Sequence, residues 1–182
     1  MEVKLIEHNG LDMVDMAIGE CYDKGCYIDE EKRTNRIEKV ALKHKHSSVL
    51  EFANFTFEIT ASTKVLLEMT RHRMASYACK SSRYTLNKGE VVFEPTGDEE
   101  VDNILLGWKV AIGTMLSRGK SNEVVSLMLP QAYQYRWLVQ FNARSLQNFF
   151  ELRRSKSAHF QIREVADAMF ECVPKNMKYI FE

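Results

Sequence analysis

The sequence lacks the features that would assign it at once to a membrane, secreted or nucleic-acid-binding class. No apolar run approaches the ~18–20 residues that a membrane span needs. Residues 1–10 carry neither the basic start nor the apolar core of a signal peptide. Its 25 basic residues balance 25 acidic ones, so no net charge draws the chain to nucleic acid or to an anionic membrane. We therefore expect a cytoplasmic protein with no membrane or nucleic-acid partner, in which any anion site is local.

Cysteine is scarce, and no metal-binding pattern is present. The cysteines form no C-x-x-C pair, so in a reducing compartment we expect buried thiols rather than disulfides. His44 and His46 are too close in sequence to ligate one metal from a single helix face, and no second cluster completes such a site. The sequence therefore predicts no metal site. The cysteines are Cys21, Cys26, Cys79 and Cys172.

Glycine and proline are also few, with eight and three residues, and the chain has neither an internal repeat nor a low-complexity linker. We therefore expect residues 1–182 to form a single domain. Helical patterns outnumber strand patterns and do not alternate regularly with them. This order predicts an α+β fold in which helices pack on a small, mostly antiparallel sheet.

Apolar periodicity predicts the individual elements. Strict alternation over residues 55–60 and 133–141 predicts two half-buried strands, with a shorter strand around 91–93. The longest helix is expected from the cap Asp98 to about Gly119, and we expect its apolar stripe to lie in the core. Other helices are expected over about 11–21, from the cap Asp29 through Ala41, from the cap Ser62 toward Arg71, over 122–129, and in two segments between 146 and 174.

One segment concentrates positive charge in a neutral protein. Arg71, His72, Arg73, Lys80 and Arg83 fall between residues 71 and 84 and are interleaved with hydroxyl side chains. Arginine forks, serine hydroxyls and loop amides are the donors that a phosphate ester needs. On composition alone, a solvated basic turn at a helix C-terminus is an equally good interpretation.

A second segment carries amide and guanidinium donors. Asn142 and Arg144 lie at an expected junction between strand and helix, and Asn148, Leu152 and Arg153 follow along roughly one helix face. These donors can converge on one ligand. Surface helices often carry such residues, so the segment alone is weak support for a site.

Together the two segments resemble the flavin-dependent thymidylate synthases. That family is marked by Arg-His-Arg followed about seven residues later by Ser. Here Arg71-His72-Arg73 is followed after seven residues by Ser81 and then by Arg83-Tyr84. The likeness spans about residues 11–172 and also includes Lys43-His44-Lys45-His46 leading to Glu51, Leu129-Pro130, Asn142 to Leu146, Asn148-Phe149, Leu152-Arg153, Ala158 and Ile162.

The resemblance implies a fold, an assembly and a reaction. It implies the family's own α+β fold, assembled as a homotetramer with FAD bound where subunits meet. It also implies methylation of deoxyuridylate (dUMP) to thymidylate (dTMP), with methylenetetrahydrofolate as one-carbon donor and NADPH as reductant. The family needs no cysteine nucleophile, so Cys79 is not expected to act as one.

The resemblance also implies roles for individual residues. The expected FAD contacts are His46, Ser48, Arg71, His72, Arg73, Asn142, Arg144 and Asn148. The expected nucleotide contacts are Glu68, Arg71, Ser81, Ser82 and Arg83, with Arg153 at the uracil. Arg153 is the expected catalytic residue, because a guanidinium would favour the N3-deprotonated, electron-rich ring. The alternative is that Arg153 only pairs with Glu151 or with a neighbouring helix.

Several departures from the family pattern leave other functions open. Glu68 stands where the family has Gln, Ser82 where it has Gly and Ser126 where it has a nucleotide-binding Arg; Ala78, Ser157 and His159 also differ. Losing one arginine contact and gaining one carboxylate would each weaken nucleotide binding by roughly 1.5–3 kcal/mol. One alternative is therefore a family member with another pyrimidine nucleotide or product, such as a hydroxymethylated one. Another is a flavin- or RNA-binding protein without turnover, although zero net charge and the absence of an RNA-binding motif argue against RNA.

Overall fold

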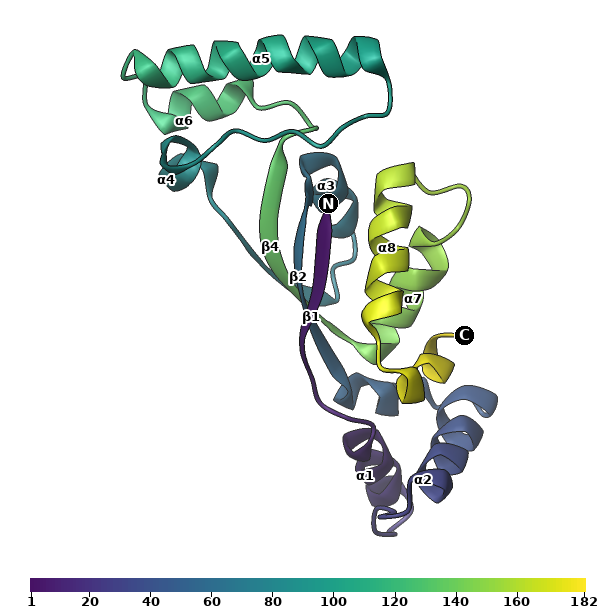
Figure 1. Ribbon diagram of the computed structural model, residues 1–182. Helices are drawn as coiled ribbons and strands as arrows, with labels where there is room; N and C mark the ends of the chain where they lie inside the picture. Colours follow the sequence, from purple (N-terminus) through teal and green to yellow (C-terminus); the bar gives the residue numbers. More distant parts are fainter.

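The computed structural model describes residues 1–182 and is organised around a four-stranded antiparallel sheet (Figure 1). The strand order is β1-β2-β4-β3. The helices α7 and α8 lie beside the sheet, α1 and α2 lie at one end of the molecule, and α4, α5 and α6 lie at the other. The strands are β1 (Glu2–His8), β2 (Asn54–Ser62), β3 (Ala75–Cys79) and β4 (Gln134–Asn142). The α+β prediction with an antiparallel sheet is confirmed.

The two central strands show why alternation predicted them. In β2, Phe55, Phe57 and Ile59 are buried, while the residues between them are only partly covered. β4 runs opposite β2 and presents Phe141, Val139 and Trp137 as their register partners on the same face. These cross-strand pairs form one wall of the main core, and α7 and α8 contribute the other.

Helix starts follow the capping residues expected from the sequence. The side chains of Asp29, Ser62 and Asp98 each accept a hydrogen bond from the backbone N–H three residues on. The helices are α1 (Asp12–Cys21), α2 (Glu30–Ile37), α3 (Thr63–Met69), α4 (Ser82–Thr85), α5 (Glu99–Ser117), α6 (Asn122–Val125), α7 (Ala143–Arg153) and α8 (Phe160–Cys172). A π-helical segment (Glu38–Lys43) extends α2, and short 3-10 segments cover Ser47–Phe52, Leu86–Lys88, Ser126–Met128 and Lys175–Phe181.

Both edge strands, β1 and β3, are absent from the elements predicted from the sequence. Each is short of buried apolar residues: β1 has none that is fully buried, and β3 consists mainly of small residues. They are strands because β2 and β4 supply backbone hydrogen-bond partners. The short strand expected over 91–93 is reduced to one bridge between Phe93 and Tyr133.

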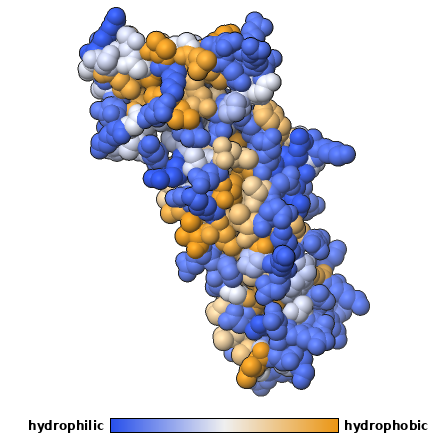
Figure 2. Space-filling view, in the orientation of Figure 1, coloured by the Kyte–Doolittle hydropathy of each residue, from blue (hydrophilic) through white to orange (hydrophobic).

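The expectation that the apolar stripe of α5 lies in the core is wrong. Only Ile112 of this stripe is buried, whereas Ile104 is 61% and Trp108 44% exposed. The helix packs on a small separate cluster of five buried residues at the end of the molecule, away from the main core. Figure 2 shows apolar residues gathered at this end and beside the sheet. Periodicity identified the apolar face correctly, but one copy of the chain does not cover it.

The cysteines also differ from expectation. All four are free thiols, but Cys21, Cys26 and Cys79 are exposed and only Cys172 is half-buried. Cys21 ends α1, Cys26 lies in the following loop, and Cys79 ends the outer strand β3, so none of the three reaches the core. None of the helices combines the length and apolar character that crossing a bilayer requires.

Candidate functional site

A cavity of about 470 Å³ brings the two cation-bearing segments together. It lies where the turn after α3 meets one face of α7. Its lining carries four guanidinium groups and a single carboxylate, so the cavity is strongly positive. The lining residues are Glu51, Arg71, His72, Arg73, Met74, Asn142, Arg144, Ser145, Asn148, Leu152 and Arg153.

The start of α7 is fixed by its cap residue, Asn142. The Asn142 side-chain oxygen accepts a hydrogen bond from the Ser145 N–H at 2.8 Å, which caps α7 and fixes Asn142 at the junction between β4 and the helix. Arg144, Asn148 and Leu152 then recur every four residues and share one helix face. This spacing turns all three toward the cavity.

Tyr77 of β3 anchors the turn that carries Arg71 to Arg73. Its hydroxyl lies 2.7 Å from the Met69 carbonyl oxygen and 3.0 Å from that of His72. Burial raises the pKa of Tyr77 to about 12, so the hydroxyl stays protonated and can donate. The turn is therefore held to the sheet at the position where it meets α7.

Arg153 is fixed by three acceptors. Its Nε donates to His72 Nε2 at 2.9 Å, Nη1 donates to Glu68 Oε2 at 2.9 Å, and Nη2 donates to the Glu68 carbonyl oxygen at 3.0 Å. Its side chain is only 17% exposed. A guanidinium has five N–H donors, so two remain for a ligand. The partner is thus Glu68 of α3, and Arg153 makes no ion pair with Glu151.

Glu68 is the centre of a cation cluster. Its side chain is 12% exposed, and its carboxylate lies 3.2 Å from Lys64, 3.8 Å from Arg71 and 2.9 Å from Arg153. Burial by itself raises the pKa of the Glu68 carboxyl, but the hydrogen bond from Lys64 and the charges of Arg71 and Arg153 outweigh it and lower the pKa. One ionised carboxylate thus faces three cations, and the cluster stays net positive.

His72 is held as a neutral ring. Burial and the charge of Arg153 lower its pKa below the ordinary value. Because Nε2 accepts a hydrogen bond from Arg153, the ring proton belongs on Nδ1. Phe149 packs edge-on against the ring at 5.0 Å between centroids. His72 therefore contributes a fixed acceptor and no charge at neutral pH.

The structure gathers most of the residues that the sequence singled out, but not all. Seven of them line the cavity, and Glu68 contacts two of these lining residues. His46 and Ser48 are exposed and outside the lining, although their segment reaches it through Glu51, which accepts from Arg144 at 2.7 Å. The seven are Arg71, His72, Arg73, Asn142, Arg144, Asn148 and Arg153.

Four lining residues were not predicted as site residues. Glu51, Met74, Ser145 and Leu152 line the cavity although the sequence analysis gave them no contact role. Each lies next to, or in one segment with, a residue that was predicted. The spacing along α7 was a usable signal for Leu152, because it follows Asn148 by four residues.

Ser81, Ser82 and Arg83 lie away from the cavity. β3 carries the chain outward from Met74, and at ~3.3 Å per residue Cys79 at its end is about 13 Å from Ala75. In Figure 1, α4 lies beside α6 at the end of the molecule that holds α5. Arg83 is exposed there and pairs with Glu123 of α6 at 3.6 Å. One copy of the chain therefore separates the two parts of the predicted nucleotide site.

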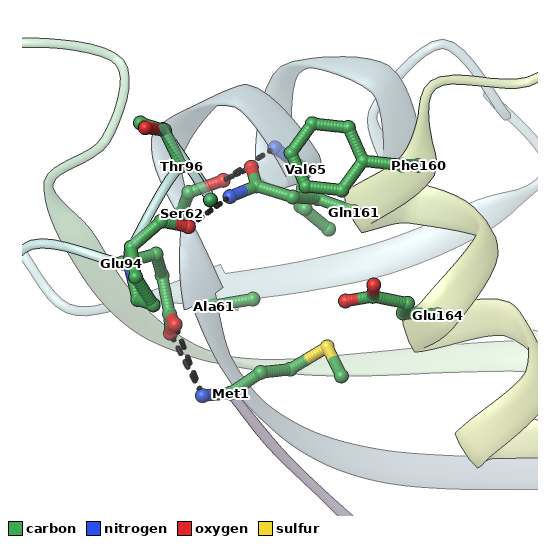
Figure 3. Close-up of a pocket in the computed structure, with 11 residues that line it drawn as sticks. Met1, Ala61, Ser62, Val65, Glu94, Thr96, Phe160, Gln161 and Glu164 are labelled. Atoms are coloured by element: carbon green, nitrogen blue, oxygen red, sulfur yellow. Dashed lines mark hydrogen bonds and ion pairs between the residues drawn. The ribbon is translucent and has the colours of Figure 1, made fainter. Parts of the chain in front are cut away.

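A different cavity of about 340 Å³ lies between the end of β2, α8 and residues 94–97 (Figure 3). Its buried polar groups already have partners within the chain. Glu94 pairs with the Met1 amino group at 3.0 Å and accepts from Gln134, and the Ser62 hydroxyl donates to Gln161. We therefore do not assign ligand chemistry to it.

Known proteins are similar to this chain over its whole length. The family model described as thymidylate synthase complementing protein matches residues 4–177. The flavin-dependent thymidylate synthase of Campylobacter jejuni (strain RM1221) is 36% identical over 201 residues, covering 100% of this chain and 96% of the relative. That of Wolinella succinogenes is 36% identical over 198 residues, covering 100% and 97%.

A solved structure is also similar. The crystal structure of thymidylate synthase X from Helicobacter pylori with FAD and dUMP matches with a TM-score of 0.93 at 30% sequence identity. The match covers 100% of this chain and 98% of that chain. Fold and length are therefore shared with this relative as well.

Proposed function

The chain belongs to the flavin-dependent thymidylate synthase family, and from this premise we propose that it binds FAD and methylates deoxyuridylate to thymidylate. We further propose methylenetetrahydrofolate as the one-carbon donor and NADPH as the reductant. The observation that carries the proposal is the cavity at α7, where two segments 70 residues apart supply four guanidinium groups and two asparagine side chains. No other cavity described above combines this charge with family residues.

The donor set of this cavity fits FAD. The cofactor carries a diphosphate and a planar ring, and FAD when bound supplies the electron transfer between the reductant and the one-carbon unit. Arg71 is 71% exposed and Arg144 51%, and each has one carboxylate partner, so N–H donors of both guanidinium groups remain for phosphate oxygens. We propose that these two, with Arg73, Asn142 and Asn148, hold the cofactor.

His72, His46 and Ser48 complete the proposed flavin contacts. His72 lines the cavity, and its neutral ring adds no charge there. His46 and Ser48 stand at the start of the Ser47–Phe52 segment, which reaches the cavity through Glu51. We propose that both exposed side chains contact the cofactor once it is bound.

Arg153 is the proposed catalytic residue. Two of its N–H donors are uncommitted, and its position is fixed by Glu68 and His72. A fixed guanidinium against the pyrimidine edge stabilises the negative charge that develops when N3 loses its proton. The ring is then electron-rich at C5, the carbon that receives the one-carbon unit. Because Arg153 does not have to reorganise, this stabilisation is available throughout the reaction.

We propose that the chain works as a homotetramer of one-domain subunits. The position of Ser81, Ser82 and Arg83 outside the lining of the α7 cavity supports this, since in one copy Arg83 pairs with α6 instead. The exposed apolar face of α5 supports it as well, because large apolar patches commonly mark protein interfaces. The phosphate contacts of Ser81 to Arg83 would then come from a second copy. The cytoplasmic location expected from the sequence stays a prediction.

A specific observation favours a second candidate, the same chemistry on another pyrimidine nucleotide. Arg83 is paired with Glu123, and Ser126 lies on the same short helical stretch with its hydroxyl donating to the Glu123 carbonyl oxygen. The end of the molecule expected to hold the phosphate therefore has one arginine fewer than the family pattern and one carboxylate nearby. A nucleotide with a different ring or charge would meet these residues differently.

The first experiment is a spectral titration of the FAD-loaded protein with deoxyuridylate. A saturable change of the flavin absorption band, followed by thymidylate formation when methylenetetrahydrofolate and NADPH are added, is the expected result. Bound flavin that responds only to another pyrimidine nucleotide would establish the second candidate. Failure to bind FAD, with salt-dependent RNA binding in its place, would overturn both.

A further inference from the structure

A second positive cavity lies at the end of the molecule formed by α1 and α2. Its volume is about 530 Å³, within the ~300–1,000 Å³ range of small-molecule sites. Lys24, Lys32, Arg36, Lys39 and His44 line it together with two tyrosines, and no carboxylate does. It shares no lining residue with the α7 cavity, so its charge serves no role described above.

Three lysines of this cavity are electrostatically unpaired. Lys32 and Lys39 are seven residues apart, about two helical turns, and therefore lie on one face of α2 and its π-helical extension. Lys24 lies in the loop between α1 and α2. None of the three forms an ion pair, although the chain contains as many acidic as basic residues. The local excess of positive charge is therefore not neutralised from within the chain.

Glu30 and Glu38, in α2 and its extension, lie toward the C-terminal segment rather than toward the cavity. Glu30 accepts a hydrogen bond from Asn176 of the C-terminal segment at 3.1 Å, and Glu30 and Glu38 both act on Tyr179 of that segment. Two carboxylates of this stretch, together with Arg33, thus lie toward the C-terminal segment, whereas Lys32, Arg36 and Lys39 line the cavity without a carboxylate. Such sorting concentrates one sign of charge in a concave site, which attracts ligands of the opposite sign.

The wall of the cavity is rigid because Arg36 is locked in place. Its Nη2 donates to the Asp15 carbonyl oxygen at 2.9 Å and Nη1 donates to Gly25 O at 3.1 Å, while Nε pairs with the Asp15 carboxylate at 2.5 Å. The guanidinium also lies 4.2 Å above the Tyr27 ring. Asp15 is fully buried and its other oxygen accepts from the Tyr27 N–H, so this carboxylate does not oppose a ligand.

We propose that the α1–α2 cavity binds a small organic polyanion, with the ammonium groups of Lys24, Lys32 and Lys39 on its anionic groups. The exposed ring of Tyr22 offers a surface for a planar or apolar part of the ligand. An ammonium group is a compact charge without the planar, two-pronged donor geometry of arginine, so it binds phosphate and carboxylate groups alike. The ligand's charge can therefore come from nucleotide-type phosphates or from a polycarboxylic acid.

The test is a calorimetric titration with two probes, sodium tripolyphosphate and triglutamate. The protein is loaded with FAD and saturated with deoxyuridylate, so that the cations of the α7 cavity are engaged. We expect saturable binding of at least one probe, weaker at higher salt. K32A/K39A should weaken it about tenfold or more, because each charge-assisted contact is worth roughly 1.5–3 kcal/mol.

The matched control is K88A/K120A, which removes two exposed, unpaired lysines from the α4–α6 end, at the opposite end of the molecule from this cavity. It should leave the affinity within about twofold, since surface charges beyond one Debye length are screened. If K32A/K39A loses affinity only for tripolyphosphate, the ligand carries phosphate groups. If it loses affinity only for triglutamate, the ligand carries carboxylates. No binding of either probe to the wild-type protein, or equal weakening in both double variants, would overturn the proposal.

Discussion

The two ends of the proposed nucleotide site are built in opposite ways. At the α7 cavity, Arg153 is mostly buried and held by three acceptors at 2.9–3.0 Å. At the α4–α6 end, Arg83 is 60% exposed with one carboxylate partner at 3.6 Å, beside the uncovered apolar face of α5. The first end is preorganised within one chain. The second exposes charged and apolar side chains that a second subunit would cover. The difference indicates that the contacts of the second end with the nucleotide depend on assembly.

Arg153→Ala should have the largest effect. Removing a preorganised charge from the reacting ring should lower kcat by about 10²–10³-fold or more while leaving FAD bound. Turnover and flavin content are measured on the same sample. Arg154→Ala is the matched control, because the neighbouring arginine pairs with Asp167 and lies over the Phe170 ring, outside the cavity lining, and its loss should keep turnover within about threefold. Full activity of Arg153→Ala would remove this residue from the mechanism.

Ile104→Glu tests the uncovered face of α5. An unpaired carboxylate placed in an apolar interface costs several kcal/mol, so the concentration for half-assembly should rise about a hundredfold or more. Light scattering measures the mass, and circular dichroism checks that the helix remains. Asn103→Glu puts the same charge on an exposed polar position of α5 and should assemble normally. Unchanged assembly of Ile104→Glu would exclude this face as an interface.

Arg83→Ala tests whether the two ends meet across subunits. Loss of one charged phosphate contact should weaken deoxyuridylate binding about ten- to a hundredfold without loss of FAD. When Arg83→Ala chains are refolded together with Arg153→Ala chains, activity should return, because some sites then combine two intact halves. Mixed samples as inactive as the separate variants would mean that each site is made by one chain.

Glu68→Ala and Glu68→Gln separate positioning from charge. Alanine removes the acceptor that holds Arg153 Nη1, so we expect kcat to fall about tenfold with a smaller change in FAD affinity. Glutamine keeps an oxygen in that place and should retain most of kcat. Equal activity of all three proteins would show that Arg153 does not need Glu68 for its position.

The smallest expected effect is a pH dependence of stability. His72 and Glu68 both have a lowered pKa in the folded chain, so the unfolded chain binds more protons, and their stabilisation is present at neutral pH and lost on acidification. The contribution of His72 to the free energy of unfolding should decrease as the pH drops below 6.5, the ordinary pKa of histidine. The contribution of Glu68 should decrease as the pH drops below 4.5, the ordinary pKa of its carboxyl group. Denaturant unfolding of wild type and His72→Gln checks this. A His72 pKa at or above 6.5 by NMR would contradict it.

Parts of the fold were predictable because they depend on local patterns. The alternation in β2 and β4 and the caps Asp29, Ser62 and Asp98 involve residues that are close in sequence. The edge strands β1 and β3 were not predictable, since a strand with little buried surface is defined by the neighbour that pairs with it. The exposure of α5 was missed for a related reason. Periodicity identifies an apolar face but not what covers it.

The site residues also fall into those that local patterns predicted and those that depend on distant contacts. The motif around Arg71 and the spacing along α7 identified seven residues that line one cavity. The contact between Glu68 and Arg153 joins positions 85 apart, and no local pattern encodes it. Nor could spacing reveal that Ser81 to Arg83 leave the cavity, because that follows from the direction in which β3 runs.

The sequence alone therefore determined the helical and strand periods, the helix starts and the family to which the chain belongs, because each depends on residue types at fixed local intervals. The tertiary structure decided the rest. It joined Glu68 to Arg153, made β1 and β3 into strands, left α5 uncovered, and gathered unpaired lysines between α1 and α2. These outcomes depend on where the chain path brings distant residues together, and only the packing of the whole chain fixes that path.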